Sequence, residues 1–388
     1  MTESSPADRG PWAVFLVFLR LGLTSFGGPI AHLGYFREEF VARRRWMSER
    51  SYADLVALCQ FLPGPASSQV GIAIGLSRAG HAGALAAWAG FTLPSAVALI
   101  LFALGIARYG EQVPVGALHG LKVAAVAVVA QAVWGMARQL CPDAQRVTLM
   151  AAAACFVLLV PAAWAQVGAI AVAGCVGLWL FRSVEVSAHD AVPMVATDRR
   201  RAWLWLALIS PNQTLAMVDA FYRAGSLVFG GGHVVLPLLQ AEVVPTGWVD
   251  NDAFLAGYGA AQAVPGPLFT FAAFLGASMN EGPSGWLGGL ICLLAIFAPS
   301  FLLVLGALPY WERLRTSRRT RAALTGVNAA VVGLLLAALY QPVWIGAIFA
   351  PRDFGLALVA LVALMFWKLP PWLVVMGCGL AGALMLGA

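Results

Sequence analysis

Long apolar stretches alternate with short polar loops along this chain. A run of roughly 20 apolar residues is long enough to cross a bilayer as a helix. Clear examples are Gly83 to Ile106, Leu121 to Ala137, Trp286 to Leu308, Ala322 to Leu339 and Phe354 to Trp367. The pattern predicts an all-α polytopic membrane protein with about ten full crossings and two short hairpins.

The second half of the chain repeats the first at an offset of about 203 residues. "FLRLGLTSFGG" from Phe18 returns as "FYRAGSLVFGG" from Phe221, and "LHGLKVAAVAVV" from Leu118 returns as "LTGVNAAVVGLL" from Leu324. Both halves also carry a Pro-Gly-Pro and, further on, a Pro-Ser pair that ends in Ser95 or Ser300. Internal repeats of this length indicate a duplicated unit. We expect an N-terminal transporter repeat over 1–188, a cytoplasmic linker over 189–207 and a C-terminal repeat over 208–388.

The charged loops predict that the two repeats have opposite orientations. One loop of the N-terminal repeat carries five arginines, Arg37, Arg43, Arg44, Arg45 and Arg50. The matching loop of the C-terminal repeat, from Ala241 to Asp252, has no lysine or arginine. Basic loops stay in the cytoplasm, so the second loop is expected outside. Inverted-topology repeats with broken helices and short hairpins at their interface are typical of secondary transporters, whose substrates bind near the midplane.

Four breaks interrupt the apolar helices, namely the Phe-Gly-Gly and the Pro-Gly-Pro of each repeat. Non-helical backbone at membrane depth is tolerated only where it is buried in protein or lines a cavity. A half-helix that starts after such a break points free N–H groups inward and forms an anion site. The breaks and the neighbouring hydroxyls and amides are therefore our candidate substrate-binding residues. They are Gly27, Gly28, Pro29, Gln60, Pro63, Gly64, Pro65, Ser67, Ser68, Gly230, Gly231, Gly232, Gln262, Pro265, Gly266, Pro267 and Thr270. Gln60 and Gln262 could equally hold helices together.

Two arginines, Arg20 and Arg223, lie inside apolar segments. A charge at the centre of a membrane helix costs about 2.5–3.5 kcal/mol on insertion scales, so it usually faces a cavity or a partner. Both are candidate substrate-binding residues, with snorkelling to an interface as the alternative. Asp219 lies one helical turn before Arg223 and is predicted to pair with it.

Candidates for proton transfer or gating are His32, Lys122 and His233, with packing roles as the alternative. The other carboxylates we considered lie in or beside loops, namely Glu38, Glu39, Asp54, Glu242, Asp250 and Asp252. The polar groups within the membrane are then cationic or neutral, which favours an anionic substrate.

Composition narrows the class of protein further. The chain is 61% hydrophobic and only 11% charged, far from a soluble domain. Its net charge of +6 fits basic cytoplasmic loops better than nucleic-acid binding. The six cysteines are scattered, so no metal site or cofactor is expected. A lipid or polyprenyl transferase would need paired carboxylates, and the sequence has no D-x-x-D cluster, so we expect no catalytic residues and no enzyme.

The motifs resemble those of the chromate ion transporter (CHR) family. The resemblance rests on "SFGGPIAHLGYFREEFV", "LCQFLPGPASSQ", "FGGGHVVLPLLQAEVV" and "GAAQAVPGPLFTFAAFLGA". It implies a long-chain, two-domain member that exports chromate across the bacterial cytoplasmic (inner) membrane and confers chromate resistance. It also implies competition by sulfate, which has the same shape and charge. A sulfate or molybdate transporter is the alternative, and the sequence is compatible with a homodimer.

Overall fold

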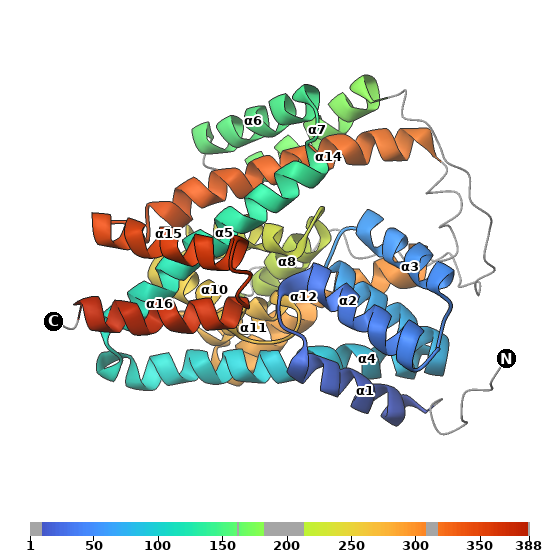
Figure 1. The fold of residues 1–388 in the computed structure, drawn as a ribbon, viewed down its shortest axis with the longest axis horizontal. Helices are drawn as coiled ribbons and strands as arrows, with labels where there is room; N and C mark the ends of the chain where they lie inside the picture. Colours follow the sequence, from blue (N-terminus) through green and yellow to red (C-terminus); the bar gives the residue numbers. More distant parts are fainter. Residues whose placement is uncertain (1–9, 161–162, 182–212, 308–316, 387–388) are drawn as a thin grey trace.

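The computed structural model describes residues 10–160, 163–181, 213–307 and 317–386, and every regular element in these ranges is helical (Figure 1). The predicted linker over 189–207 lies outside them. The helices of the N-terminal repeat are α1 (Pro11–Thr24), α2 (Gly28–Arg37), α3 (Glu49–Phe61), α4 (Ala66–Tyr109), α5 (Val115–Leu140), α6 (Ala144–Leu159) and α7 (Ala163–Leu180). Those of the C-terminal repeat are α8 (Gln213–Ser226), α9 (Val235–Val243), α10 (Asn251–Ala263), α11 (Phe271–Ala277), α12 (Gly285–Ala307), α14 (Arg318–Ala338), α15 (Pro351–Met365) and α16 (Pro371–Leu386). The predicted all-α class is confirmed.

Four described helices, α4, α5, α12 and α14, are long and apolar enough to span a membrane. They contain most of the clearest apolar stretches of the sequence. Shorter apolar helices, among them α6, α7 and α16, are candidates for the remaining crossings. The protein is therefore a polytopic membrane protein in which several of the expected crossings are shorter than about 20 residues.

The longest helix, α4, contains a sharp reversal. Its backbone leaves helical geometry at Ala79 and Gly80, where Gly80 has a φ of 60°. The reversal brings Gly75 so close to the carbonyl of Gly83 that a side chain on either glycine would collide with the other. The first part of α4 therefore folds back against the start of the remainder, which runs along the length of the molecule (Figure 1).

Helices of one repeat pack directly against helices of the other repeat. α5 of the N-terminal repeat packs against α16 of the C-terminal repeat, and α14 packs against α7. Both crossings are made by glycines at equivalent positions: Gly120 lies against the backbone of Cys378, and Gly326 lies against the backbone of Ala173. Small residues let two membrane helices approach to backbone contact, so these pairs fix the helices at close range.

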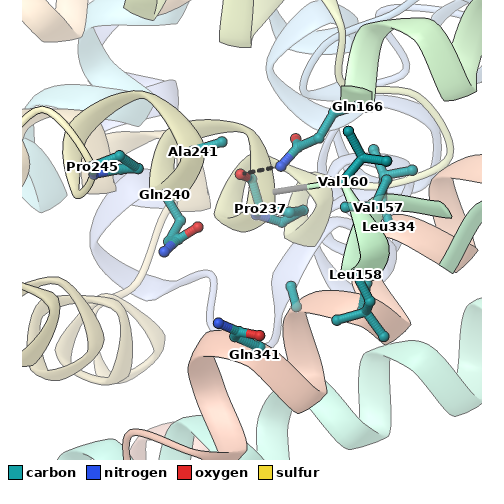
Figure 2. A pocket seen from close by; sticks show the side chains of 12 residues that line it. Val157, Leu158, Val160, Gln166, Pro237, Gln240, Ala241, Pro245, Leu334 and Gln341 are labelled. Carbon is teal, nitrogen blue, oxygen red and sulfur yellow. Dashed lines mark hydrogen bonds between the residues drawn. The ribbon is translucent and has the colours of Figure 1, made fainter. Parts of the chain in front are cut away.

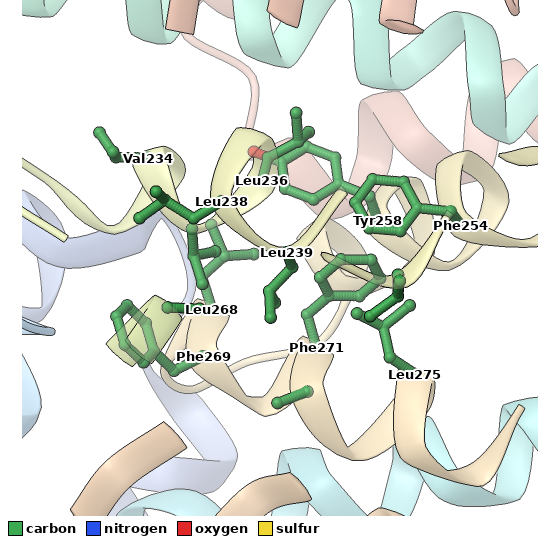
Figure 3. Packing of buried hydrophobic residues seen from close by; sticks show 14 of the residues in the cluster. Val234, Leu236, Leu238, Leu239, Phe254, Tyr258, Leu268, Phe269, Phe271 and Leu275 are labelled. Atoms are coloured by element: carbon green, nitrogen blue, oxygen red, sulfur yellow. The ribbon is translucent and has the colours of Figure 1, made fainter. Parts of the chain in front are cut away.

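Aromatic side chains fill the core of each repeat. In the C-terminal repeat, the ring of Phe271 makes edge contacts with Phe254 and Tyr258 (Figure 3). In the N-terminal repeat, Phe36 makes edge contacts with Phe18 and Phe40. Edge-to-face pairs of this kind hold the rings in fixed positions.

Candidate substrate site at the helix breaks

The breaks of the two repeats contact each other. The N–H of Gly64 donates a hydrogen bond of 2.6 Å to the carbonyl of Val228, and the N–H of Gly266 donates one of 3.0 Å to the carbonyl of Ser25. Ser25 and Val228 each directly precede the Phe-Gly-Gly of their repeat. Each Pro-Gly-Pro turn is thus bonded to the Phe-Gly-Gly turn of the other repeat, and the equivalent positions repeat the same contact.

Glycine is required at these turns because the backbone is left-handed. φ is 102° at Gly27, 120° at Gly64, 73° at Gly230 and 108° at Gly266. Residues with a Cβ seldom adopt such angles. A Cβ on Gly266 would also lie 2.8 Å from the hydroxyl of Ser95, so space and backbone angle both demand glycine there.

The N-termini that follow the Pro-Gly-Pro turns differ between the repeats. Pro65 caps α4 directly, as expected, whereas Pro267 is followed by a 3₁₀ turn before the seven-residue α11 begins. The amide groups of Gly64 and Gly266 within the turns are committed to carbonyls of the other repeat. The hydroxyl of Thr270 is committed too, because it donates to the carbonyl of Pro267 at 2.8 Å.

His32 connects the first Phe-Gly-Gly turn to the start of α4. Its Nε2 lies 3.2 Å from the carbonyl of Ser25, and its Nδ1 lies 3.4 Å from the hydroxyl of Ser67. A carbonyl only accepts hydrogen bonds, so Nε2 carries the proton and Ser67 donates to Nδ1 when the ring is neutral. His32 is 1% exposed and therefore belongs to the interior beside the turns.

Several polar atoms around these turns are buried without a partner. Within the described residues, no hydrogen-bond partner is found for the side-chain oxygens of Ser25, Ser68, Gln69 and Ser300 or for the amide nitrogen of Gln262. Leaving such a group unpaired costs about 1–3 kcal/mol, so an unpaired cluster indicates a position for a ligand or water. Of these five residues, the sequence pointed only to Ser68 and Gln262. Ser300 belongs to the Pro-Ser pair that both repeats share, and Gln69 follows the first Pro-Gly-Pro closely, but neither position indicates a site residue by itself.

The two arginines of the apolar segments, Arg20 and Arg223, lie on exposed helix faces. Arg20 is exposed on α1. Arg223 is half exposed and pairs with Asp219 at 3.0 Å and with Glu242 at 3.1 Å. The predicted pair between Arg223 and Asp219 is confirmed, and the second carboxylate adds further neutralisation that the helical spacing did not reveal.

The other candidates have separate partners. The amine of Lys122 pairs with Asp252 at 3.0 Å, and Nδ1 of His233 lies 2.9 Å from the hydroxyl of Tyr258. Gln60 is exposed on α3.

Glu39 is an exception among the carboxylates that the sequence placed in or beside loops. It is buried, and Arg43 and Arg44 form ion pairs with it. No group of three or more potential metal ligands occurs among the described residues.

A separate cavity of about 220 Å³ lies between α6, α7, α9 and α14 (Figure 2). Three glutamines line it, Gln166, Gln240 and Gln341, together with apolar side chains such as Leu158 and Leu334. Gln166 donates to the carbonyl of Pro237 at 3.1 Å and so ties α7 to α9. None of the residues that the sequence proposed for the substrate lines this cavity.

Apolar crossing helices, broken around a buried polar centre, define a multi-pass membrane protein. The family model described as "Chromate transporter" matches residues 12–178 and then matches again over residues 215–383. The chain therefore belongs to the chromate transporter family, as its motifs indicated. The double match also agrees with the duplication read from the sequence.

Similar proteins are known in bacteria and archaea. A chromate transport protein of Pseudomonas aeruginosa is 28% identical, covering 98% of this chain and 94% of the relative. A chromate transport protein of Cupriavidus metallidurans is 26% identical over 95% of this chain and 91% of its own length. An uncharacterized transporter of Methanocaldococcus jannaschii is 27% identical over 84% and 82%. No solved structure matches the chain.

Proposed function

We propose that this protein exports chromate from the bacterial cytoplasm across the inner membrane and so confers chromate resistance. The observation that carries the proposal is the family model's match to both repeats, supported by relatives whose names describe chromate transport. The buried, unpaired polar atoms at the helix breaks support a substrate site between the repeats. Sulfate, with the same tetrahedral shape and charge, is the expected competitor.

The direction of transport follows from electrostatics. Moving one elementary charge through 100 mV is worth about 2.3 kcal/mol, so a dianion gains roughly twice that on leaving a negative interior. Export needs no coupled ion, whereas uptake would need a cation flux that exceeds the charge of the anion. The mechanism we propose is movement of one inverted repeat against the other, which exposes the central site to each side in turn.

Flux measurements in inside-out membrane vesicles test this function. With a potential imposed so that the vesicle lumen is positive, we expect chromate to accumulate in vesicles that contain the protein, and excess sulfate to slow that accumulation. Vesicles from cells without the protein are the control. Sulfate or molybdate flux without chromate flux would overturn the proposal, as would net chromate movement only in the uptake direction.

The two arginines can be tested in the same vesicles. The exposed position of Arg20 and the two carboxylates around Arg223 reduce the charge that either could offer to an anion. We therefore expect Arg20→Ala and Arg223→Ala to retain measurable chromate flux at equal membrane levels. Complete loss in both variants would restore them as essential ligands.

A further inference from the structure

We propose that the transported oxyanion is held by neutral hydroxyl donors, namely Ser25 and Ser68 of the N-terminal repeat and Ser300 of the C-terminal repeat. The inference rests on the proposed function, because it names the groups that bind the substrate. It places the site on the N-terminal side of the repeat interface instead of equally on both repeats.

The first observation is the environment of the start of α4. Ser67 contacts His32, which in turn contacts the carbonyl of Ser25. The next residue, Ser68, is 2% exposed, and its hydroxyl has no partner within the described chain. Ser25 is 0% exposed, and its hydroxyl also has no partner within the described chain. Two unpaired donors thus lie around the N-terminus of a long helix, where the helix dipole favours negative charge.

The second observation is that the C-terminal repeat supplies Ser300 to this region. A Cβ on Gly64 would lie 3.0 Å from the hydroxyl of Ser300 and 2.6 Å from Nε2 of Gln69. Ser300 is fully buried and its hydroxyl is unpaired among the described residues. Nε2 of Gln69 donates to the carbonyl of Pro63 at 2.7 Å, so Gln69 positions the turn and one of its two amide hydrogens is committed there.

The third observation is that the positions equivalent to these serines, around the other Pro-Gly-Pro turn, offer no free hydroxyl. Val228 replaces Ser25 there, and Phe269 replaces Ser67. Thr270 replaces Ser68 but donates to a backbone carbonyl. Ser95, the counterpart of Ser300, likewise donates to the carbonyl of Thr92 at 3.0 Å. Only one of the two sets of equivalent positions therefore has hydroxyls available for an anion.

Neutral donors suit a substrate that must be released. A pair between a buried cation and a dianion in a low-dielectric site is strong and slow to separate, because each charge is poorly solvated there. Hydroxyls give weaker hydrogen bonds in a geometry that matches several oxygens of a tetrahedron. Transport needs binding that is favourable for entry and weak enough for exit, as in ion pathways generally.

The test is chromate affinity in inside-out vesicles, measured as the KM of uptake for Ser25→Ala, Ser68→Ala and Ser300→Ala at matched membrane levels. Each hydroxyl that donates to an ionised oxygen should raise KM by about tenfold or more when it is removed. Ser95→Ala is the matched control for Ser300→Ala, since its hydroxyl is committed to Thr92. Ser77→Ala is the control on α4, since Ser77 is an exposed residue whose hydroxyl donates to the carbonyl of Ile74.

Chromate-induced protection against thermal unfolding in detergent provides a second measurement that does not depend on flux. We expect chromate to stabilise wild type and both controls, with the midpoint concentration shifted upward in the three site variants. An unchanged KM and midpoint in all three would overturn the hydroxyl site while leaving chromate export intact. Failure of wild type to transport chromate would instead overturn the proposed function.

Discussion

The two Pro-Gly-Pro hairpins are equivalent in sequence but differ in packing. Helix α10 of the C-terminal repeat packs against α5 and α16, and Leu255 and Gly259 within it are buried. Its counterpart α3 packs mainly against α4, and the equivalent Ala53 and Ala57 are exposed. One hairpin is therefore closed onto α5 of the other repeat and onto α16 of its own repeat, and the other hairpin is not closed in this way. The difference shows that duplication of the sequence does not enforce equal burial.

An ion pair marks the closed hairpin. Lys122 on α5 is 8% exposed and bonds to Asp252 at the start of α10, at 3.0 Å. The equivalent positions of the other repeat hold Asn328 and Arg50, which cannot form an ion pair with each other. The closed arrangement of α10 thus has an electrostatic contact that the sequence of the other repeat does not provide.

The largest expected effect comes from filling the space between α10 and α5. A Cβ on Gly259 would collide with the backbone carbonyl of Leu121. We expect Gly259→Leu to destabilise the protein by about 3 kcal/mol, because overpacking a tight crossing forces the helices apart. Thermal unfolding in detergent, followed by the monodisperse fraction on size exclusion, would measure it.

The equivalent change in the open hairpin is the control. Ala57→Leu should alter stability by less than about 0.5 kcal/mol, since the position is exposed. If α3 must close during transport as α10 has closed here, this stable variant should lose most of its chromate flux. Equal stability of Gly259→Leu and Ala57→Leu would contradict the packing difference.

We expect a smaller loss of stability at the ion pair between Lys122 and Asp252. The loss should depend on which of the two side chains is removed. The aspartate side chain is 75% exposed and the lysine side chain only 10%. Asp252→Asn leaves a buried amine without its counter-charge and should cost about 1–3 kcal/mol. Lys122→Met leaves only a solvated carboxylate and should be nearly neutral. Unfolding midpoints of the two variants and of the double variant would measure this, and the opposite order would refute it.

The sequence predicts the helix breaks and local ion pairs, but it does not predict which helices pack together. The breaks were visible because glycine and proline have backbone preferences that act locally, as the left-handed φ of Gly64 and Gly266 shows. The pair of Arg223 with Asp219 follows from helical spacing. The position of Ser300 beside Gly64 could not be predicted in this way, because the packing of both repeats decides which helices contact each other.

The smallest expected effect on stability comes from two carboxylates at equivalent positions of the repeats, Glu39 and Glu242. Burial alone would raise the pKa of the Glu39 carboxyl, but the hydrogen bonds and charges of Arg44 and Arg43 outweigh it and hold the pKa below its ordinary value. Burial raises the pKa of the Glu242 carboxyl, and Arg223 offsets this only in part.

The signs of their contributions to stability are therefore opposite. The ionised Glu39 stabilises the fold above its unfolded pKa of about 4.3, and this contribution is lost as pH falls through the lower folded pKa. Glu242 binds its proton more tightly when folded, so its ionisation costs stability at neutral pH. At pH 7 we expect Glu39→Gln to lower the free energy of unfolding by at most about 1 kcal/mol and Glu242→Gln to leave it unchanged or raise it. Urea unfolding at pH 7 and at pH 4 would measure both, and a larger loss for Glu39→Gln at pH 4 than at pH 7 would contradict the assignment.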